Sequence, residues 1–118
     1  MTQILGTQKR KFLFSCTGTH PPEVMMEIAK NIIQFAGMTP ARPGRIDYYP
    51  YNGKGGEGYS LYQPLCESYL IIDVYTDVGE NGESEVLLST CKPNRISPGA
   101  MIAFLSKEIG VTEYRGSL

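Results

Sequence analysis

Residues 60–77, SLYQPLCESYLIIDVYTD, decide how the rest of the chain is interpreted. Two largely apolar segments, Tyr59–Leu65 and Tyr69–Tyr75, flank the polar pair Glu67–Ser68. The second segment alternates, and alternation is typical of a strand, because successive strand side chains point to opposite faces of a sheet. We expect Leu70, Ile72 and Val74 on one face and Ile71, Asp73 and Tyr75 on the other.

Length and composition limit the class of protein. The chain has 118 residues, enough for one domain with a core and too few for two, so we expect a single domain over 1–118. A formal net charge of −1 gives no electrostatic reason to bind nucleic acid or a membrane surface. No apolar run is long enough to span a bilayer, and no signal-peptide pattern is present.

The three cysteines, Cys16, Cys66 and Cys91, are far apart and do not have the spacing of metal ligands. A zinc site or a disulfide framework is therefore not expected, and we expect Cys16 and Cys66 to pack as small apolar side chains. An odd number of unpaired cysteines fits a reducing compartment, so we expect a cytoplasmic protein without a bound metal.

Three further strands follow from the same alternation: Lys11–Ser15, Glu85–Thr90 and Val111–Tyr114. Residues 79–82, GENG, predict the turn of a hairpin. Pro64 has no backbone N–H, so we expect the second strand to be interrupted or at an edge at that position.

Two helices are expected. The first follows Thr19 or His20 as the capping region, has the prolines in its first turn, and ends at Gly37. The second begins with Ser97 as its cap and Pro98 in the first turn. The expected buried stripes are Val24, Met25, Ile28, Ile32, Phe35 and Ala36 in the first helix, and Met101, Ile102, Leu105 and Ile109 in the second.

These elements predict an α+β fold, a two-layer sandwich in which two helices cover one face of a mainly antiparallel sheet. Residues 1–8 are expected to form a loose arm, and Met38–Gly58 to be irregular. The glycine-rich part of that segment, Gly53–Gly58, follows several tyrosines, so it either closes over a planar ligand or packs those rings on the sheet. The uncovered sheet face is either solvated or a site, which a second subunit could close. It would carry Asp73, Tyr75, Ser89 and Cys91.

The spacing of the polar residues resembles the small bacterial and archaeal S-adenosylmethionine decarboxylases, over nearly the whole chain. In that family a Ser-Glu-Ser-His segment leads into a strand that carries a second histidine, an aromatic residue and an acid. A Thr-Cys-Gly segment follows the next hairpin. The matching residues here are Cys66-Glu67-Ser68-Tyr69, then Asp73, Tyr75 and Asp77, then Thr90-Cys91-Lys92.

The resemblance implies a self-cleaving precursor. The Ser68 hydroxyl would attack the carbonyl of Glu67, and elimination and hydrolysis would leave a pyruvoyl group at the new N-terminus. That group forms a Schiff base with the substrate amine and acts as an electron sink while carbon dioxide leaves. The implied activity is decarboxylation of S-adenosylmethionine for polyamine synthesis, in a homodimer with sites at the interface.

The resemblance also assigns roles residue by residue. Cys91 would return the proton, Ser60 would assist processing, and Asp73 stands where the family has the histidine that drives ester elimination. Tyr75 would stack on adenine, Asp77 would bind the ribose hydroxyls, and Glu67 would contribute to the pocket. Tyr69 and Lys92 also depart from the family pattern, in which a histidine and a glycine occupy these positions.

Other interpretations remain open from the sequence. The chain could be a non-processing homologue that binds S-adenosylmethionine or a related nucleoside, or that regulates a partner. It could also be a pyruvoyl decarboxylase of another amino acid, such as ornithine or arginine. Residue by residue, Cys91 could be a buried apolar thiol, Asp73 a solvated side chain, and Asp77 ordinary turn chemistry.

Overall fold

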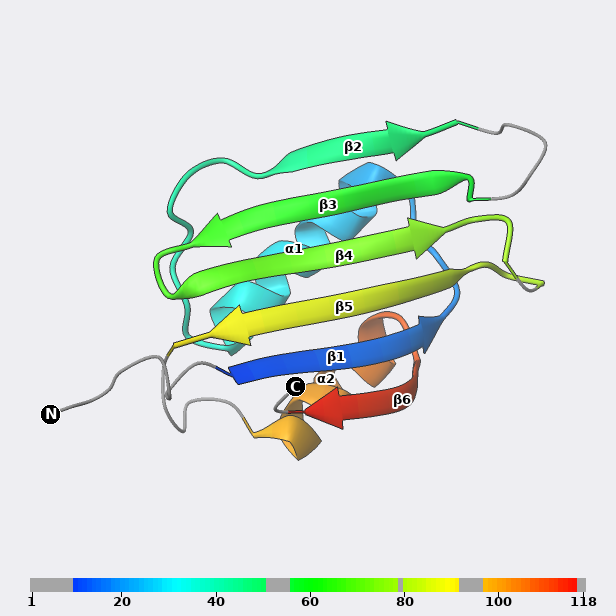
Figure 1. Cartoon of the computed structure of the whole chain (residues 1–118). Coiled ribbons are helices and arrows are strands. Elements are labelled where there is room, and N and C mark those ends of the chain that lie inside the picture. The colour runs from blue at the N-terminus through cyan, green and yellow to red at the C-terminus, as the bar shows by residue number, and fades with distance from the viewer. Residues whose placement is uncertain (1–9, 51–55, 79, 92–96, 117–118) are drawn as a thin grey trace, which may run out of the picture.

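The computed structural model of the chain describes residues 10–50, 56–78, 80–91 and 97–116. Within these residues lie six strands and two helices, and every pair of neighbouring strands is antiparallel. The order across the sheet is β2-β3-β4-β5-β1-β6 (Figure 1). The elements are β1 (Arg10–Thr17), α1 (Pro22–Phe35), β2 (Arg45–Tyr49), β3 (Gly58–Leu65), β4 (Ser68–Tyr75), β5 (Glu83–Thr90), α2 (Pro98–Glu108) and β6 (Val111–Gly116).

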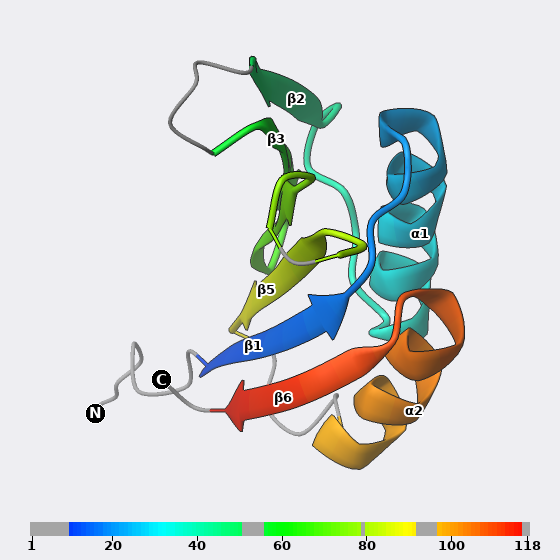
Figure 2. The same cartoon turned by 90° about the vertical axis from the view of Figure 1, so that its right-hand side faces the viewer.

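The two helices cover one face of the sheet and leave the other face open, which confirms the predicted α+β sandwich (Figure 2). We call the uncovered side the open face. The alternation predicted for β4 and β5 is confirmed, because every side chain expected under the helices is fully buried. These side chains are Leu70, Ile72, Val74, Val86 and Leu88.

Strand β2 was not expected, since Met38–Gly58 was predicted to be irregular. Arg45–Tyr49 pairs with β3 from Arg45 opposite Tyr62 to Tyr49 opposite Gly58. The segment has one partly buried apolar residue, Ile46, and is otherwise exposed, so it carries no periodic signal of its own. Pairing with β3 makes it a strand, as is common for short edge strands.

The apolar stripe of α1 was predicted partly wrongly. Val24 and Phe35 are 40% and 46% exposed, whereas Ala29 and Ile33 are buried. Phe35 instead stacks on Phe104 of α2, with ring centroids 4.6 Å apart at the surface between the two helices. The buried set is Met25, Ile28, Ala29, Ile32 and Ile33.

The helix starts agree with the sequence. Pro21 occupies the N-cap position of α1 without a side-chain hydrogen bond, so His20 lies next to the cap, and Pro22 begins the helix. The second helix starts as predicted, because the Ser97 hydroxyl accepts a hydrogen bond from the amide of Ala100 at 3.3 Å. In α2 only Met101 and Leu105 are fully buried, while Ile102 and Ile109 pack against the rim of the core.

The prediction for Pro64 is confirmed in part: β3 is not interrupted there, but at Pro64 it is no longer paired with β2. β3 runs through Pro64 without interruption and lies between β2 and β4. The pairing of β2 ends opposite Tyr62, however, and beyond it the Pro64 carbonyl accepts a hydrogen bond from Ala41 at 3.0 Å. The missing N–H therefore faces the side where β2 has already ended and costs no ladder bond.

Several expectations concern residues outside the described ranges: the arm at 1–8, residues 53–55 of the glycine-rich segment, Gly79 of the hairpin turn and the loop at 92–94.

Two glycines near the start of β3, Gly56 and Gly58, provide a matched test of backbone packing. Gly58 has φ +156°, and a Cβ there would lie 1.8 Å from the carbonyl oxygen of Val74. Gly56 has φ +85°, and a Cβ there would meet nothing within 4 Å. We expect Gly58→Ala to lower the free energy of unfolding by about 3 kcal/mol and Gly56→Ala by about 1 kcal/mol, since only the former adds a backbone clash. Urea unfolding of both variants measures this, and equal losses would contradict it.

Candidate functional site

The backbone at the start of β4 is unusual. Cys66 and Glu67 form the turn between β3 and β4, and Ser68 is the first residue of β4. Ser68 has φ +156°, and it is the one non-glycine residue with positive φ among the residues that the structure describes. A side chain in this region of backbone space costs about 1–3 kcal/mol, and such strain tends to occur at functional sites.

Hydrogen bonds hold this junction against the end of β5. The amide of Cys91 donates to the carbonyl oxygen of Glu67 at 2.9 Å. The hydroxyls of Ser68 and Ser89 lie 2.8 Å apart and share a hydrogen bond, and Ser89 is fully buried. The Glu67–Ser68 peptide bond, the Ser68 hydroxyl and Cys91 therefore lie close together. We call Glu67, Ser68, Ser89 and Cys91 the cleavage group.

The three cysteines differ in environment. Cys16 is buried in the core, as predicted, and burial raises the pKa of its thiol to about 11. Cys66 was expected to pack and is instead exposed. Cys91 is exposed as well, so the alternative interpretation of it as a buried apolar thiol is wrong.

These environments predict selective alkylation. With iodoacetamide at about pH 8, Cys66 and Cys91 of the folded protein should react and Cys16 should not, because the thiolate is the nucleophile and Cys16 remains a buried thiol. Peptide mapping by mass spectrometry locates the labels, and unfolding in urea should release the third site. Labelling of Cys16 in the folded protein would contradict the prediction.

Because the pKa of Cys16 is raised in the folded state, its contribution to stability is complete below about pH 9 and is lost as the pH rises towards 11.

A second group of polar residues lies farther along the sheet. The Ser60 hydroxyl donates to a carboxylate oxygen of Asp73, its direct neighbour across β3 and β4. The phenol of Tyr49 donates to the Ser60 hydroxyl at 3.0 Å. We call Tyr49, Ser60 and Asp73 the acid group. Sequence reasoning missed Tyr49 because its strand was not recognised, although the interleaved tyrosines at 48, 49 and 51 were a visible signal.

Tyr75 and Asp77 lie beyond the acid group. Tyr75 pairs with Gly58, and partial burial, followed by the negative charge of Asp73, raises the pKa of its phenol. Asp77 accepts a hydrogen bond from the amide of Glu57 at 3.2 Å, so its carboxylate supports the chain entering β3. Similarly, a carboxylate oxygen of Glu67 accepts from the amide of Thr39 at 3.0 Å.

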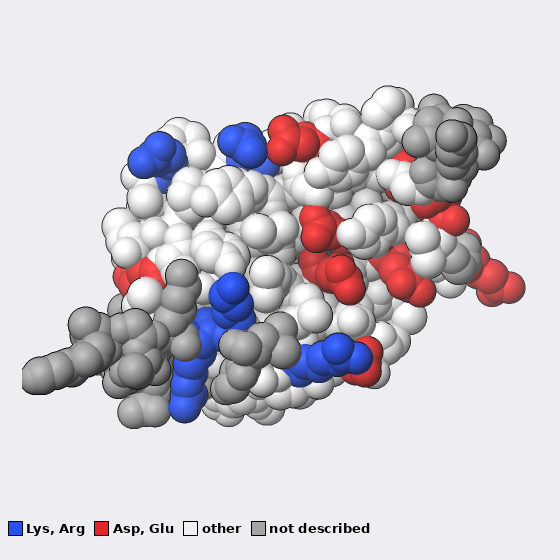
Figure 3. All heavy atoms as spheres, in the orientation of Figure 1, with Lys and Arg blue, Asp and Glu red and all other residues white. Residues whose placement is uncertain are grey.

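The two groups are separated within one chain. Asp73 follows Ser68 by five residues on the same strand, which corresponds to about 16 Å. The structure thus brings Glu67, Ser68 and Cys91 together, and Ser60 with Asp73, without joining the two sets. Figure 3 views the open face and shows the acidic residues gathered near the middle and one end of the sheet, with Lys and Arg towards the other end and the lower rim.

The two main cavities of the described residues lie away from the cleavage group. One, of about 680 Å³, lies between α1 and the segment before β2. The other, of about 590 Å³, is lined by Tyr48, Tyr49 and the chain before α1. None of Ser68, Ser89 and Cys91 lines either cavity.

The protein is thus a two-layer α+β domain with a strained serine junction beside an exposed cysteine. No known protein-family model matches the chain, and no curated protein matches it either. None of the described helices is both long and apolar enough to cross a membrane. Within the described ranges, no cluster of three or more His, Cys, Asp or Glu side chains is arranged to hold a metal ion.

Proposed function

We propose that this chain is the precursor of a cytoplasmic pyruvoyl-dependent decarboxylase that cleaves itself between Glu67 and Ser68 and acts on S-adenosylmethionine. The observation that carries the proposal is the hydrogen bond from the Cys91 amide to the carbonyl oxygen of Glu67, 2.9 Å long, next to a serine with positive φ. The carbonyl to be attacked, its stabilising donor and the strained nucleophilic residue are adjacent.

The first step uses these groups directly. The Ser68 oxygen attacks the carbonyl carbon of Glu67 and gives its proton to the peptide nitrogen, whose bond to that carbon breaks to leave an ester. Negative charge develops on the carbonyl oxygen during the attack, and the Cys91 amide is already directed at that oxygen. Relief of backbone strain at Ser68 lowers the barrier further.

The second step needs a base. Removal of the Ser68 Cα proton breaks its Cβ–Oγ bond, so Glu67 leaves as a carboxylate and residue 68 becomes a dehydroalanine. This enamine takes up a proton at Cβ to become an imine, and water hydrolyses the imine to the pyruvoyl carbonyl and ammonia. Asp73 is the candidate by resemblance, with Ser60 beside it, but in its own chain Asp73 lies about 16 Å from Ser68 along β4. We therefore propose a homodimer in which the open faces pack on each other.

A two-fold axis between the open faces, crossing β4 at right angles, supplies the missing groups. Such an axis reverses the strand direction, so that Asp73 of the partner subunit lies near Ser68, and the reverse pairing occurs at the same time. The segregation of acids and bases along the open face favours this antiparallel arrangement, because opposite charges then face each other (Figure 3).

Mixed dimers test this arrangement. Ser68→Ala and Asp73→Asn should each remain uncleaved when expressed alone. When the two are co-expressed, the Asp73→Asn chain should be cleaved, because its Ser68 meets the intact Asp73 of the partner subunit. Intact mass distinguishes the two chains. Absence of cleavage in the mixture would contradict the shared site, whereas cleavage of Asp73→Asn alone would remove the role of Asp73.

In the mature protein the pyruvoyl carbonyl would supply an electrophile for the substrate amine and a sink for the electrons left by carbon dioxide. Cys91 returns a proton to the substrate carbon, and its exposure suits that role. Tyr75 provides a ring face for adenine, and Asp77 has carboxylate lone pairs for the ribose hydroxyls. The acidic zone of the open face attracts the positively charged sulfonium substrate.

The mass of the freshly purified protein decides the first step. We expect two chains, one that ends at Glu67 and one that begins at residue 68. The second chain should be lighter by the mass of one ammonia than a fragment with an unaltered serine at its N-terminus. Cyanoborohydride with S-adenosylmethionine should add the substrate to the second chain only. Carbon dioxide release from S-adenosylmethionine, ornithine and arginine then separates the substrates. A single intact chain after prolonged incubation would contradict the proposal.

A second candidate is a non-processing homologue that binds S-adenosylmethionine or a related nucleoside, or that regulates a partner. The hydrogen bond between the hydroxyls of Ser68 and Ser89 favours it, because it holds the nucleophile in a stable partnership. Calorimetry of the uncleaved protein with S-adenosylmethionine distinguishes the candidates. Heat of binding without cleavage would support the second candidate, and the absence of any heat would rule out nucleoside binding.

A further inference from the structure

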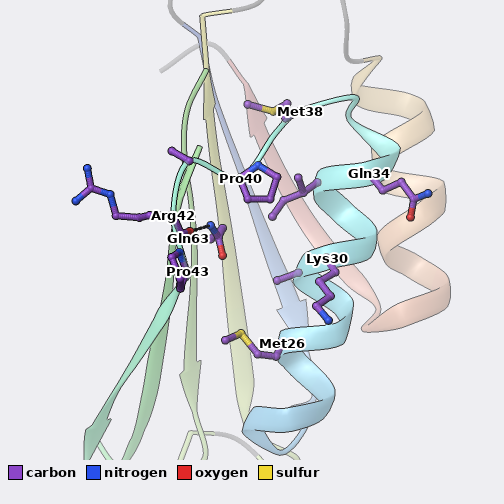
Figure 4. Close-up of a pocket in the computed structure, with 12 residues that line it drawn as sticks. Met26, Lys30, Gln34, Met38, Pro40, Arg42, Pro43 and Gln63 are labelled. Atoms are coloured by element: carbon purple, nitrogen blue, oxygen red, sulfur yellow. Dashed lines mark hydrogen bonds between the residues drawn. The ribbon is translucent and has the colours of Figure 1, made fainter. Parts of the chain in front are cut away.

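The cavity of about 680 Å³ lies between α1 and the segment 38–44, on the helix-covered side of the sheet (Figure 4). This is the side opposite to the open face, so the proposed decarboxylase chemistry does not use it. Its volume is within the range of small-molecule sites, roughly 300–1,000 Å³.

Most of the lining is apolar. Ala29 and Ile33 of α1 form part of one wall, and Pro40 forms part of the facing wall. Met26 reaches from α1 towards the strands, and Met38 lies near the other end of the cavity (Figure 4). Methionine side chains are unbranched and adapt to irregular ligand shapes, so the cavity suits an apolar ligand body of variable form.

One buried polar group lies on the sheet side of the cavity. Gln63 is only 9% exposed, and its amide nitrogen donates to the carbonyl oxygens of Arg42 at 2.7 Å and Pro64 at 2.9 Å. These two bonds fix the orientation of the side-chain amide. Among the described residues, no hydrogen bond to its Oε1 is found, so this buried acceptor is available to a ligand or to water.

The charged residues of the lining have one sign. Lys30 and Arg42 line the cavity, and no Asp or Glu is among its described lining residues. In Figure 4 the Arg42 guanidinium points away from α1, which leaves Lys30, an exposed residue of α1, as the cation at the mouth.

We propose that this cavity binds an amphipathic anion, with an apolar chain among Met26, Ile33 and Met38 and a carboxylate or phosphate held at the mouth by Lys30. The apolar lining provides most of the affinity, and Lys30 selects the anionic head group. Gln63 accepts a hydrogen bond from a hydroxyl or protonated group of the ligand, or from a water trapped with it.

Methyl NMR of the full chain labelled with 13C at methionine tests the proposal. The probes are decanoate, decyl phosphate and decanol. Decanoate or decyl phosphate should shift the Met26 and Met38 methyl signals, while the fully buried Met25 and Met101 report on the rest of the core and should not move. The tighter of the two anions identifies the head group. Shortening decanoate to octanoate should weaken binding by roughly fourfold for each CH2 removed.

Two sets of variants locate the site. Lys30→Met should weaken decanoate binding by about threefold without changing decanol binding, and Lys107→Met on α2 is the matched control. Ala41→Trp, at an exposed position of the lining, should block the cavity, and Ala29→Phe should do so from the buried wall. No shift of Met26 or Met38 with either anion would overturn the site. Equal binding of decanol and decanoate, both unaffected by Lys30→Met, would overturn the anionic ligand.

Discussion

Ser68→Ala should abolish self-cleavage completely and leave one intact chain, whereas the unaltered protein separates into two. The Ser68 oxygen is the only nucleophile that can form the ester, and without the ester there is no leaving group for the elimination that converts residue 68 into the pyruvoyl group, so no partial activity is expected. Intact-mass spectrometry of both proteins after the same incubation measures the effect. Ser106→Ala, at an exposed position of α2, is the control and should be cleaved normally.

A comparison with Ser68→Gly separates chemistry from backbone strain. Glycine tolerates φ +156° without cost, and alanine does not. Both variants lose the hydrogen bond to Ser89, so the difference between them reports the strain. We expect Ser68→Gly to be more stable than Ser68→Ala by about 1 kcal/mol, or about 4 °C in Tm. Equal Tm values would show that the backbone of Ser68 is not strained, and would contradict the proposal that relief of strain lowers the barrier to cleavage.

Phe14→Ala should lower the free energy of unfolding by about 4 kcal/mol, a large part of the roughly 5–15 kcal/mol that stabilises a typical domain. Phe14 is fully buried on β1, pairs with Val86 and stacks on Tyr114 with ring centroids 5.0 Å apart. Its removal leaves a cavity between β1, β6 and the helices that this rigid sheet cannot close. Urea unfolding monitored by circular dichroism measures the loss.

Phe35→Ala is the matched control, because it removes the same side chain from a position that is 46% exposed. Phe35 keeps only the stack on Phe104, so we expect a loss of about 1 kcal/mol or less. The helical spacing alone placed Phe35 in the buried stripe. A loss for Phe35→Ala as large as that for Phe14→Ala would contradict the observed burial.

The central strands were predictable because their own side chains determine them. Leu70, Ile72 and Val74 alternate with polar or partly exposed residues, and one face of β4 can be buried only in that register. The Ser97 cap of α2 was predictable for a similar reason, since a hydroxyl three residues before an amide is a local contact. Strand β2 was not predictable, because Arg45–Tyr49 is exposed at four of its five residues and depends on β3 for its conformation.

The candidate site also has a part that the sequence predicts and a part that only the tertiary structure shows. The position of Glu67–Ser68 at a break between two strands follows from the sequence, and the roles expected for the residues around it follow from the resemblance. The contact of Glu67 with Cys91, the pairing of Ser68 with Ser89 and the addition of Tyr49 to Ser60 all join residues at least eleven positions apart. Periodicity does not encode such distances, because it reports only the face on which a side chain lies.

By itself, the sequence determined the α+β class, the register of β4 and β5, and the burial of their alternate side chains, since these depend on local periodicity and on which surface must leave water. Only the tertiary structure decided that Ser68 adopts a strained backbone, that the acid group lies a strand's length away from it, and that a largely apolar cavity opens beside α1. Those features come from the pairing and packing of distant segments, whose geometry is fixed only when the sheet and both helices assemble.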